Sequence, residues 1–415
     1  MSSHRRSSLS LTLALVAIAS LGVSRTAEAQ FGSIKDRIKQ KVADKAVQKA
    51  GEKIDEAVDG KPKPEAAAQP AASTAAAAAA PAAASTASTA PTSRREWANY
   101  DFVPGARTIF FTDFTDDQVG NFPKRLTFKN GQMEVVELDG GQRALKASSF
   151  SELLIPLPEA LPPKFTIELD VINRDSRGVA ANTFEVSGGN AFNDDKFTVV
   201  GWGHNGLSVN GGGVQGMSIM AKEADIERYV GHPASFRILG DGQALKLYAD
   251  EKRIANIPNG GFQRGRTLAL YLQGRDDEKN AVYVTRIRVA ESNKDIYDEL
   301  AANGRWTTQG ILFETGKSDL KPESTPTLKA IAAALKGHPD LKVEIQGHTD
   351  NVGSAASNQT LSQARAEAVK AALVSDYAIS EDQLTAKGYG DTKPMAKNTT
   401  PEGRANNRRV EIVKR

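Results

Sequence analysis

Apolar and polar residues alternate in several short runs between residues 95 and 290, which is the period of a half-buried β-strand. The runs occupy residues 108–111, 165–171, 235–238, 244–248, 268–271 and 282–289, with turns rich in Gly and Asp between them. Short alternating runs joined by such turns are typical of an antiparallel β domain. The pattern therefore predicts a β-sandwich over residues 95–290.

The pattern changes after residue 290, where helical periods of about 3.6 residues are interleaved with short alternating runs. A short connecting helix is predicted within residues 291–309, and strands are predicted at 311–314, 341–346, 384–390 and 409–413. The order β-α-β-α-β-β predicts an α/β sandwich with its helices on one face, over residues 310–415.

Two predicted helices separate these strands. The first buries the apolar stripe Leu328, Ile331, Ala332 and Leu335. The second begins with Asn358 as its N-cap residue. Its predicted core-facing stripe is Leu361, Ala364, Ala368 and Ala372.

The first 94 residues show three further patterns. Residues 1–29 have a basic start, an apolar run and small residues at a cleavage site, so they predict a secretory signal peptide and export. Residues 30–60 predict a charged helix, with apolar positions that recur every four residues. Residues 61–94 are rich in Ala and Pro and have almost no large apolar side chain, which predicts a disordered linker.

Composition narrows the chemistry that can be expected. The 415 residues include no Cys, so we expect neither a disulfide framework nor a lipid-modified cysteine. Five scattered His without Cys argue against a zinc site, and a net charge of +3 is too small to indicate a nucleic-acid partner. We expect no metal site and no cofactor.

The most specific motif follows the predicted strand at 341–346. The sequence Gly-His-Thr-Asp-Asn-Val-Gly at 347–353 places Asp350 on a loop where that strand ends. The sequence Asn-Gln-Thr-Leu-Ser-Gln-Ala-Arg at 358–365 places Arg365 on the helix that follows. A carboxylate and a guanidinium at a fixed separation can receive the ammonium and the carboxylate of one zwitterion. An ordinary salt bridge between the two side chains is the alternative.

These residues resemble the OmpA-like C-terminal domain, whose pattern is T-D-x-x-G followed by N-x-x-L-S-x-x-R-A. The resemblance implies non-covalent binding of peptidoglycan through the diaminopimelate of an uncrosslinked stem peptide. It implies that Asp350 receives the ammonium and Arg365 the carboxylate of that residue. Thr349, Asn358 and Arg408 are implied as further ligand-binding residues, although an Arg beside an edge strand can also be only a solvated charge.

The resemblance implies a non-enzymatic cell-envelope protein of the periplasm or cell outer membrane. Such a protein would link the cell wall to the outer membrane, or to a carbohydrate or protein ligand of the β-domain. Two alternatives remain open. One is a wall- or polysaccharide-directed hydrolase with a catalytic jelly roll, and the other is an outer-membrane β-barrel with a periplasmic anchor. The short strands and an aromatic content of 6% favour the sandwich over the barrel.

The β-domain itself resembles concanavalin A-like (laminin G-like) jelly rolls. In glycosidases of that fold, one strand carries the catalytic carboxylates in the pattern E-x-D-x-x-E. Glu168 and Asp170 match the first two positions, but Asn173 stands where the second Glu is required. We therefore expect Glu168 and Asp170 to lie on a solvent-facing side of their strand. Three nearby aspartates are interpreted as turn residues rather than calcium ligands: Asp113, Asp116 and Asp117.

Overall fold

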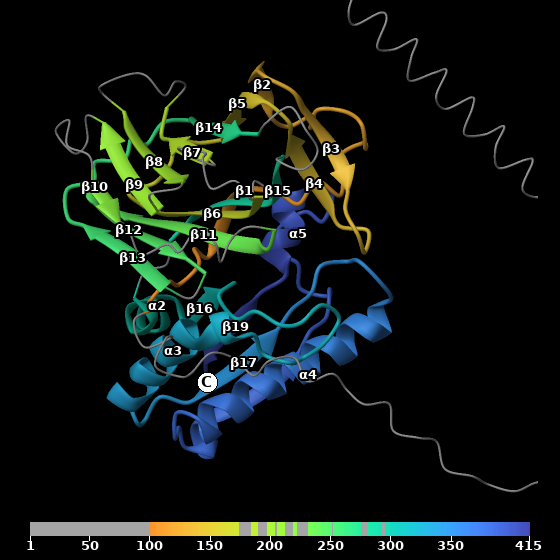
Figure 1. Cartoon of the computed structure of the whole chain (residues 1–415). Coiled ribbons are helices and arrows are strands. Elements are labelled where there is room, and N and C mark those ends of the chain that lie inside the picture. Colours follow the sequence, from red (N-terminus) through yellow and green to blue (C-terminus); the bar gives the residue numbers. More distant parts are fainter. Residues whose placement is uncertain are drawn as a thin grey trace, which may run out of the picture. The chain divides into compact units, whose positions relative to one another are not determined.

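The computed structural model describes residues 100–173, 184–189, 197–203, 206–211, 219–221, 231–250, 252–274, 281–292 and 295–415. The predicted signal peptide, charged helix and Ala/Pro-rich linker lie outside the described residues. None of the described helices is both long enough and apolar enough to cross a membrane. Two sheets form the part before residue 292, and a third sheet with its helices forms the C-terminal part (Figure 1).

The first sheet is antiparallel and runs in the order β13-β12-β11-β6-β15-β4-β3, with β1 also paired to β15. Its strands are β1 (Arg107–Thr112), β3 (Met133–Glu137), β4 (Arg143–Ala147), β6 (Lys164–Asn173), β11 (Pro233–Asp241), β12 (Ala244–Ala249), β13 (Lys252–Ile257) and β15 (Val282–Glu291). The alternating runs predicted as strands are confirmed, since all of them fall in this sheet except the run at 268–271, which belongs to the second sheet.

The second antiparallel sheet runs in the order β10-β9-β8-β7-β14-β5-β2. Its strands are β2 (Thr127–Asn130), β5 (Phe150–Pro156), β7 (Phe184–Ser187), β8 (Thr198–Gly203), β9 (Gly206–Gly211), β10 (Ile219–Ala221) and β14 (Thr267–Gln273). One apolar core lies between the two sheets, because a single cluster joins Phe110 and Ile167 of the first to Trp202 and Leu270 of the second. The two sheets thus form a sandwich. That it is a jelly roll stays a prediction.

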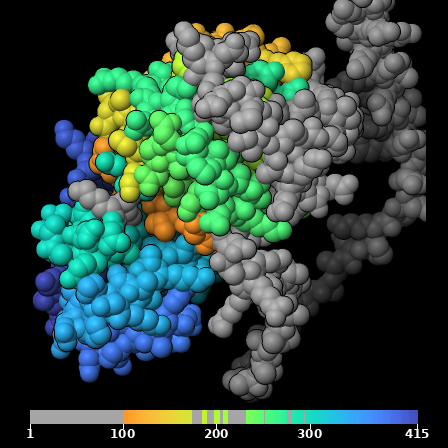
Figure 2. Space-filling model, turned by 90° about the vertical axis from the view of Figure 1, so that its left-hand side faces the viewer, coloured from red at the N-terminus to blue at the C-terminus, as the bar shows by residue number. Residues whose placement is uncertain are grey.

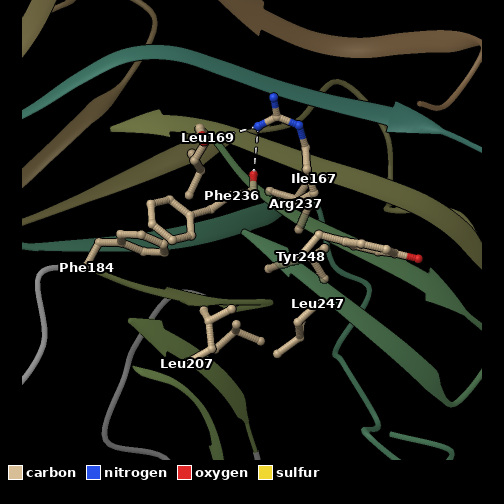
Figure 3. A pocket seen from close by; sticks show the side chains of 10 residues that line it. Ile167, Leu169, Phe184, Leu207, Phe236, Arg237, Leu247 and Tyr248 are labelled. Carbon is tan, nitrogen blue, oxygen red and sulfur yellow. Dashed lines mark hydrogen bonds between the residues drawn. The ribbon is translucent and has the colours of Figure 1, made fainter. Parts of the chain in front are cut away.

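The interior of this sandwich contains a small enclosed gap beside Phe184, Phe236 and Leu247 (Figure 3). Its volume of about 10 Å³ is close to the least that one water molecule needs. The Arg237 guanidinium beside it donates to the backbone oxygens of Leu169 at 3.3 Å and of Phe236 at 3.1 Å. This gap is therefore a packing defect and has no room for a ligand.

The outer face of the first sheet carries a network of charged side chains. Glu168 and Asp170 on β6 lie opposite Arg237 on β11 and opposite Arg288 and Arg286 on β15. Asp170 accepts from Arg286 at 2.6 Å and from Arg237 at 3.0 Å, and Glu168 pairs with Arg288. Burial alone would raise the pKa of both carboxyl groups, but the guanidinium groups around them outweigh this effect and lower both pKa values.

The prediction that these carboxylates face solvent is wrong for Glu168, of which only 3% is exposed. The physical reason is that the segment before β1 lies over this face of the sheet. Tyr100 and Phe102 in that segment pack on Tyr248 of β12, with ring centroids 5.7 and 5.2 Å from the Tyr248 ring. Gly105 contributes a backbone oxygen to Arg288 at 2.5 Å. The alternating polar residues Glu168 and Asp170 therefore belong to a buried network, which is covered by the segment before β1.

The third sheet runs in the order β16-β19-β17-β18. Its strands are β16 (Arg305–Thr308), β17 (Val343–Gly347), β18 (Leu384–Gly388) and β19 (Val410–Lys414). The helices are α2 (Ile296–Asn303), α3 (Thr325–Gly337), α4 (Ala355–Ser375) and α5 (Pro401–Asn407), with short 3₁₀ turns η5 (Pro322–Ser324) and η6 (Glu381–Gln383). Helices α2, α3 and α4 share one core with the sheet. The predicted order of strands and helices is present, with α5 added before the last strand.

Two predictions about this domain are wrong in position. The first strand is not at 311–314, where Phe313 makes only an isolated bridge to Leu320; it is β16. The backbone of Leu312 bonds instead to the Ser324 hydroxyl, at 2.8 and 3.0 Å, so this segment is tied to the turn before α3. Helix α4 also begins earlier than predicted, because Ser354 rather than Asn358 caps it.

Candidate ligand-binding site

The loop after β17 continues the path of a strand that lies between β19 and β18. The backbone N–H of His348 donates to Arg409 at 3.1 Å, and that of Thr349 donates to Gly390 at 2.9 Å. The chain is therefore held on both sides until it reaches Asp350. This loop position was predicted from the alternation that ends at residue 346, and the neighbouring strands fix the backbone there.

Asp350 is oriented by contacts to both of its carboxylate oxygens. Oδ1 accepts from the backbone N–H of Val352 at 3.1 Å, and Oδ2 accepts from Arg408 at 2.5 Å. The side-chain amide of Asn358 donates to the Asp350 backbone oxygen at 3.2 Å. A carboxylate offers about four acceptor positions, so these contacts leave capacity for another donor. Asp350 is thus fixed in direction without being saturated.

Helix α4 lies close to the sheet because two glycines at strand ends make room for it. A Cβ at Gly347 would come within 2.3 Å of the Ser362 backbone oxygen, and a Cβ at Gly388 within 2.3 Å of the Gln363 backbone nitrogen. The close approach places Ser362 at a core-facing position, so the predicted stripe of Leu361, Ala364, Ala368 and Ala372 is only half-buried, although Ala372 still packs against the core. The buried residues are instead Asn358, Ser362, Ala366, Val369 and Leu373.

Arg365 lies two turns after Asn358 on the same helix. Its Nε donates to the Lys317 backbone oxygen at 3.0 Å, and its guanidinium lies 4.9 Å from the centre of the Phe313 ring. Burial lowers the pKa of the Arg365 guanidinium, the Asp350 carboxylate raises it, and the charge of Arg408 lowers it, with a net decrease. Arg365 nevertheless remains protonated at physiological pH. Within the described chain, no direct ion pair joins it to Asp350, which pairs with Arg408.

An open hollow of about 690 Å³ lies at the start of α4, and none of the five predicted site residues lines it. One wall is the loop at 316–319, which includes Lys317, and the other is the first turns of α4, where Ala356, Thr360 and Ala364 contribute. Small-molecule sites commonly have volumes of roughly 300 to 1,000 Å³. The hollow has a volume in that range, but it is open to solvent, and its link to Arg365 is indirect, through Lys317, whose backbone oxygen accepts from Arg365.

Two buried polar side chains beside Asp350 have no hydrogen-bond partner among the described residues. They are the hydroxyl of Thr349 and both ring nitrogens of His348. Burial and the positive charge of Arg409 lower the pKa of His348 to about 4, so its ring is neutral at pH 7. The ring stacks on Tyr389 with the centroids 5.4 Å apart.

The structure gathers the five residues singled out in the sequence. Asp350 bonds directly to Asn358 and to Arg408, and Thr349 precedes it in the chain. Arg365 interacts with Asp350 through charge and without a direct contact. Arg408 was left open between a pocket residue and a solvated charge. Its side chain is 41% exposed, yet it is held by Asp350.

Sequence reasoning missed three residues that hold these side chains in place. Phe313 and Lys317 support Arg365, and Phe111 of β1 lies under Arg408, with its ring centre 5.6 Å from the guanidinium carbon. Lys317 acts through its backbone oxygen, which leaves no trace in a side-chain pattern. Phe111 is the second of two adjacent phenylalanines on one strand, and a strand with apolar residues on both faces is the signal that it is covered on both sides.

Comparisons with known proteins agree on the C-terminal part. Residues 312–408 match the OmpA family. Over 101 residues the chain is 44% identical to outer membrane porin F of Pseudomonas aeruginosa, covering 24% of this chain and 29% of the porin. Over 107 residues it is 44% identical to peptidoglycan-binding protein ArfA of Mycobacterium bovis, covering 25% of this chain and 31% of that protein.

Among solved structures, the peptidoglycan-associated lipoprotein from Burkholderia pseudomallei is 33% identical, with a TM-score of 0.24, and the match covers 25% of this chain and 88% of that one. The chain spans less than a third of the length of the two curated relatives.

Proposed function

From the premise that residues 312–408 of this chain form an OmpA family domain, we propose that the protein binds peptidoglycan non-covalently in the cell envelope. The proposed ligand is the free amino acid end of meso-diaminopimelate in an uncrosslinked stem peptide. One observation carries the proposal. Asp350 and Arg365 have opposite charges, are held by separate elements, and are not paired with each other in the described chain. A zwitterion can bridge such a pair.

The chemistry of each contact follows from the residue types. The ligand ammonium donates to the Asp350 carboxylate, which has acceptor capacity left beside its contacts to Val352 and Arg408. The ligand carboxylate pairs with the Arg365 guanidinium, whose planar fork suits a bidentate contact. Arg408 adds a second positive charge next to Asp350. With two guanidinium groups and one carboxylate, the site favours a peptide end with more carboxylates than ammonium groups.

The proposed location is the periplasm or the outer membrane, with the predicted signal peptide directing export. The relatives named as an outer membrane porin and as a peptidoglycan-binding protein support this placement. The domain would attach the rest of the chain to the wall. A link from the wall to the outer membrane, or to a ligand of the sandwich, belongs to the same proposal.

We propose no enzymatic role for the sandwich. A glycosidase needs one carboxylate as nucleophile or base and another as acid, both facing the substrate. Glu168 is instead buried and paired with Arg288, and Asp170 is paired with Arg286 and Arg237. Release of reducing ends or of stem peptides from purified cell walls by the protein would contradict this proposal.

The test is retention of the exported chain on purified peptidoglycan sacculi. Asp350→Ala and Arg365→Ala should each lose most of the binding, because the loss of one partner of a desolvated charged contact costs roughly 2 to 5 kcal/mol. Asp340→Ala and Arg264→Ala remove the same charges at exposed positions and serve as matched controls. Free meso-diaminopimelate should compete with sacculi for the unmodified protein. Retention of both site variants at the wild-type level would contradict the proposal.

A further inference from the structure

The C-terminal domain and the sandwich are joined through strand β1 and helix α5. One side of β1 pairs with β15, and α5 packs against β1. In Figure 2 the orange segment that begins the described chain lies at the boundary between the green strands of the sandwich and the blue C-terminal part. Helix α5 immediately precedes Arg408, which caps its C-terminal end. The position of Arg408 therefore depends on how α5 is held.

Side chains of α5 form hydrogen bonds with the backbone of β1, in the place that a neighbouring strand would occupy. The Asn406 side chain accepts from the Thr108 N–H at 2.8 Å and donates to the Thr108 carbonyl at 3.2 Å. Glu402 accepts from the Phe111 N–H at 2.8 Å. A register irregularity between Thr108 and Phe110 explains how N–H groups three residues apart can face the same side, because a bulge shifts the alternation by one residue.

Two ion pairs and a shared amide add to this attachment. Glu402 also pairs with Arg125, and Arg404 pairs with Asp116 at 2.6 Å. Gln309, which follows β16, accepts from the buried Arg288 at 2.6 Å and donates to Asn406 at 3.0 Å. Both ends of α5 are thus tied to the sandwich.

The Phe111 side chain completes the link to the site. Its neighbour Phe110 belongs to the core between the sheets, whereas Phe111 is outside that core and is nevertheless buried. Its ring lies under the guanidinium of Arg408, and the same guanidinium bonds to Asp350 Oδ2 at 2.5 Å. A continuous contact therefore runs from the sandwich through Phe111 and Arg408 to the carboxylate proposed to receive the ligand ammonium.

We propose that the β-sandwich is a working part of the ligand-binding site. Phe111 is a positioning residue: it holds Arg408 in the orientation that directs the Asp350 carboxylate and presents a guanidinium to a further carboxylate of the ligand. The inference rests on the proposed function of the site. According to this inference, the contact between the two domains, and not the C-terminal domain alone, gives the site its specificity for a stem peptide end with at least two carboxylates.

The experiment measures the affinity of the mature chain for a soluble stem peptide that ends in free meso-diaminopimelate, by titration calorimetry. Phe111→Leu keeps an apolar side chain and removes the aromatic face, and it should weaken binding about three- to tenfold, as expected for the loss of a cation–π contact. Phe128→Leu makes the same change at an exposed ring on β2, in the other sheet, and should leave the affinity unchanged.

A double-mutant cycle separates positioning from general loosening of the fold. In an Arg408→Ala background, Phe111→Leu should cause no further loss, because the residue through which it acts is absent. Glu402→Gln, which keeps the shape of the contact but removes the charge that pairs with Arg125, provides a second variant if Phe111→Leu lowers the melting temperature strongly. It should weaken binding in the same Arg408-dependent way.

Each outcome decides between the two proposals. Wild-type affinity in Phe111→Leu, or an equal loss with and without Arg408, would overturn the role of the sandwich and leave the wall-binding function in place. Failure of the proposed wall-binding function would give a different result. In that case the unmodified chain would not bind the peptide, and Asp350→Ala would not change retention on sacculi.

Discussion

The sandwich and the C-terminal domain both place carboxylates among arginines, with opposite results. On the sandwich, Glu168 and Asp170 meet three guanidinium groups from neighbouring strands, and the cluster is covered by the segment before β1. In the C-terminal domain, Asp350 has one guanidinium in direct contact, that of the exposed Arg408, and a second within electrostatic range. The residue types alone therefore do not distinguish a buried structural network from a candidate binding site. At the candidate site the charges are incompletely paired, and the Arg408 side chain is exposed although the Asp350 side chain is largely buried.

The largest effect on stability is expected when the buried charge network of the sandwich is disrupted. Glu168→Ala leaves the buried Arg288 without its carboxylate partner, while Arg237 keeps Asp170, and the loss of one member of such a buried pair costs about 3 to 5 kcal/mol. Urea unfolding should show this as a large decrease in the unfolding midpoint. Glu159→Ala removes a carboxylate whose ion pair with Arg107 is nearly half exposed, and should cost less than about 1 kcal/mol. Equal effects of the two changes would refute the contrast.

The buried His348 lies 3.9 Å from the Glu411 carboxylate, but burial and the charge of Arg409 outweigh the attraction of that carboxylate for a proton. His348 has a pKa of about 4 in the folded chain, below its ordinary value of 6.5. Between these values the unfolded chain binds more protons, so this contribution to stability is complete above pH 6.5 and is lost as the pH falls toward 4. The loss is at most about 3 kcal/mol. His348→Gln should flatten this part of the pH profile of urea unfolding, and an unchanged profile would contradict the expectation.

The smallest expected effect on stability comes from the site itself. Asp350→Ala removes a largely buried carboxylate, but the groups left without it can reach water, because the Arg408 side chain is 41% exposed and the Val352 N–H lies in an exposed residue. We expect a decrease of no more than about 1 kcal/mol in the free energy of unfolding. The same variant should lose sacculus binding, so stability and binding separate at Asp350. A decrease as large as that of Glu168→Ala would show that Asp350 is mainly a structural residue.

The sequence was sufficient wherever the determining pattern is local. Alternation located β6, β11, β12, β14 and β15, because each strand shows its own inner and outer face. The loop and helix motif located Asp350 and Arg365, whose spacing is set by one strand, one loop and one helix. These are properties of contiguous residues, and single-sequence reasoning can reach them.

Reasoning from sequence failed where distant segments decide the outcome. The stripe of α4 was misplaced because Gly347 and Gly388 let Ser362 approach the sheet, so a small polar residue occupies the core-facing position. Glu168 was expected in solvent because nothing near it in sequence indicates the segment that covers it. The pairing of Arg408 with Phe111 joins two domains, and no periodicity in either domain records it.

The side-chain amide of Asn406 on Thr108 has a consequence for any attempt to separate the two halves of the chain. With α5 removed, β1 would present unpaired N–H and C=O groups to solvent, which is a ready template for a strand of another molecule. A truncated sandwich would then be prone to self-association, because the C-terminal domain covers this edge of β1 through α5.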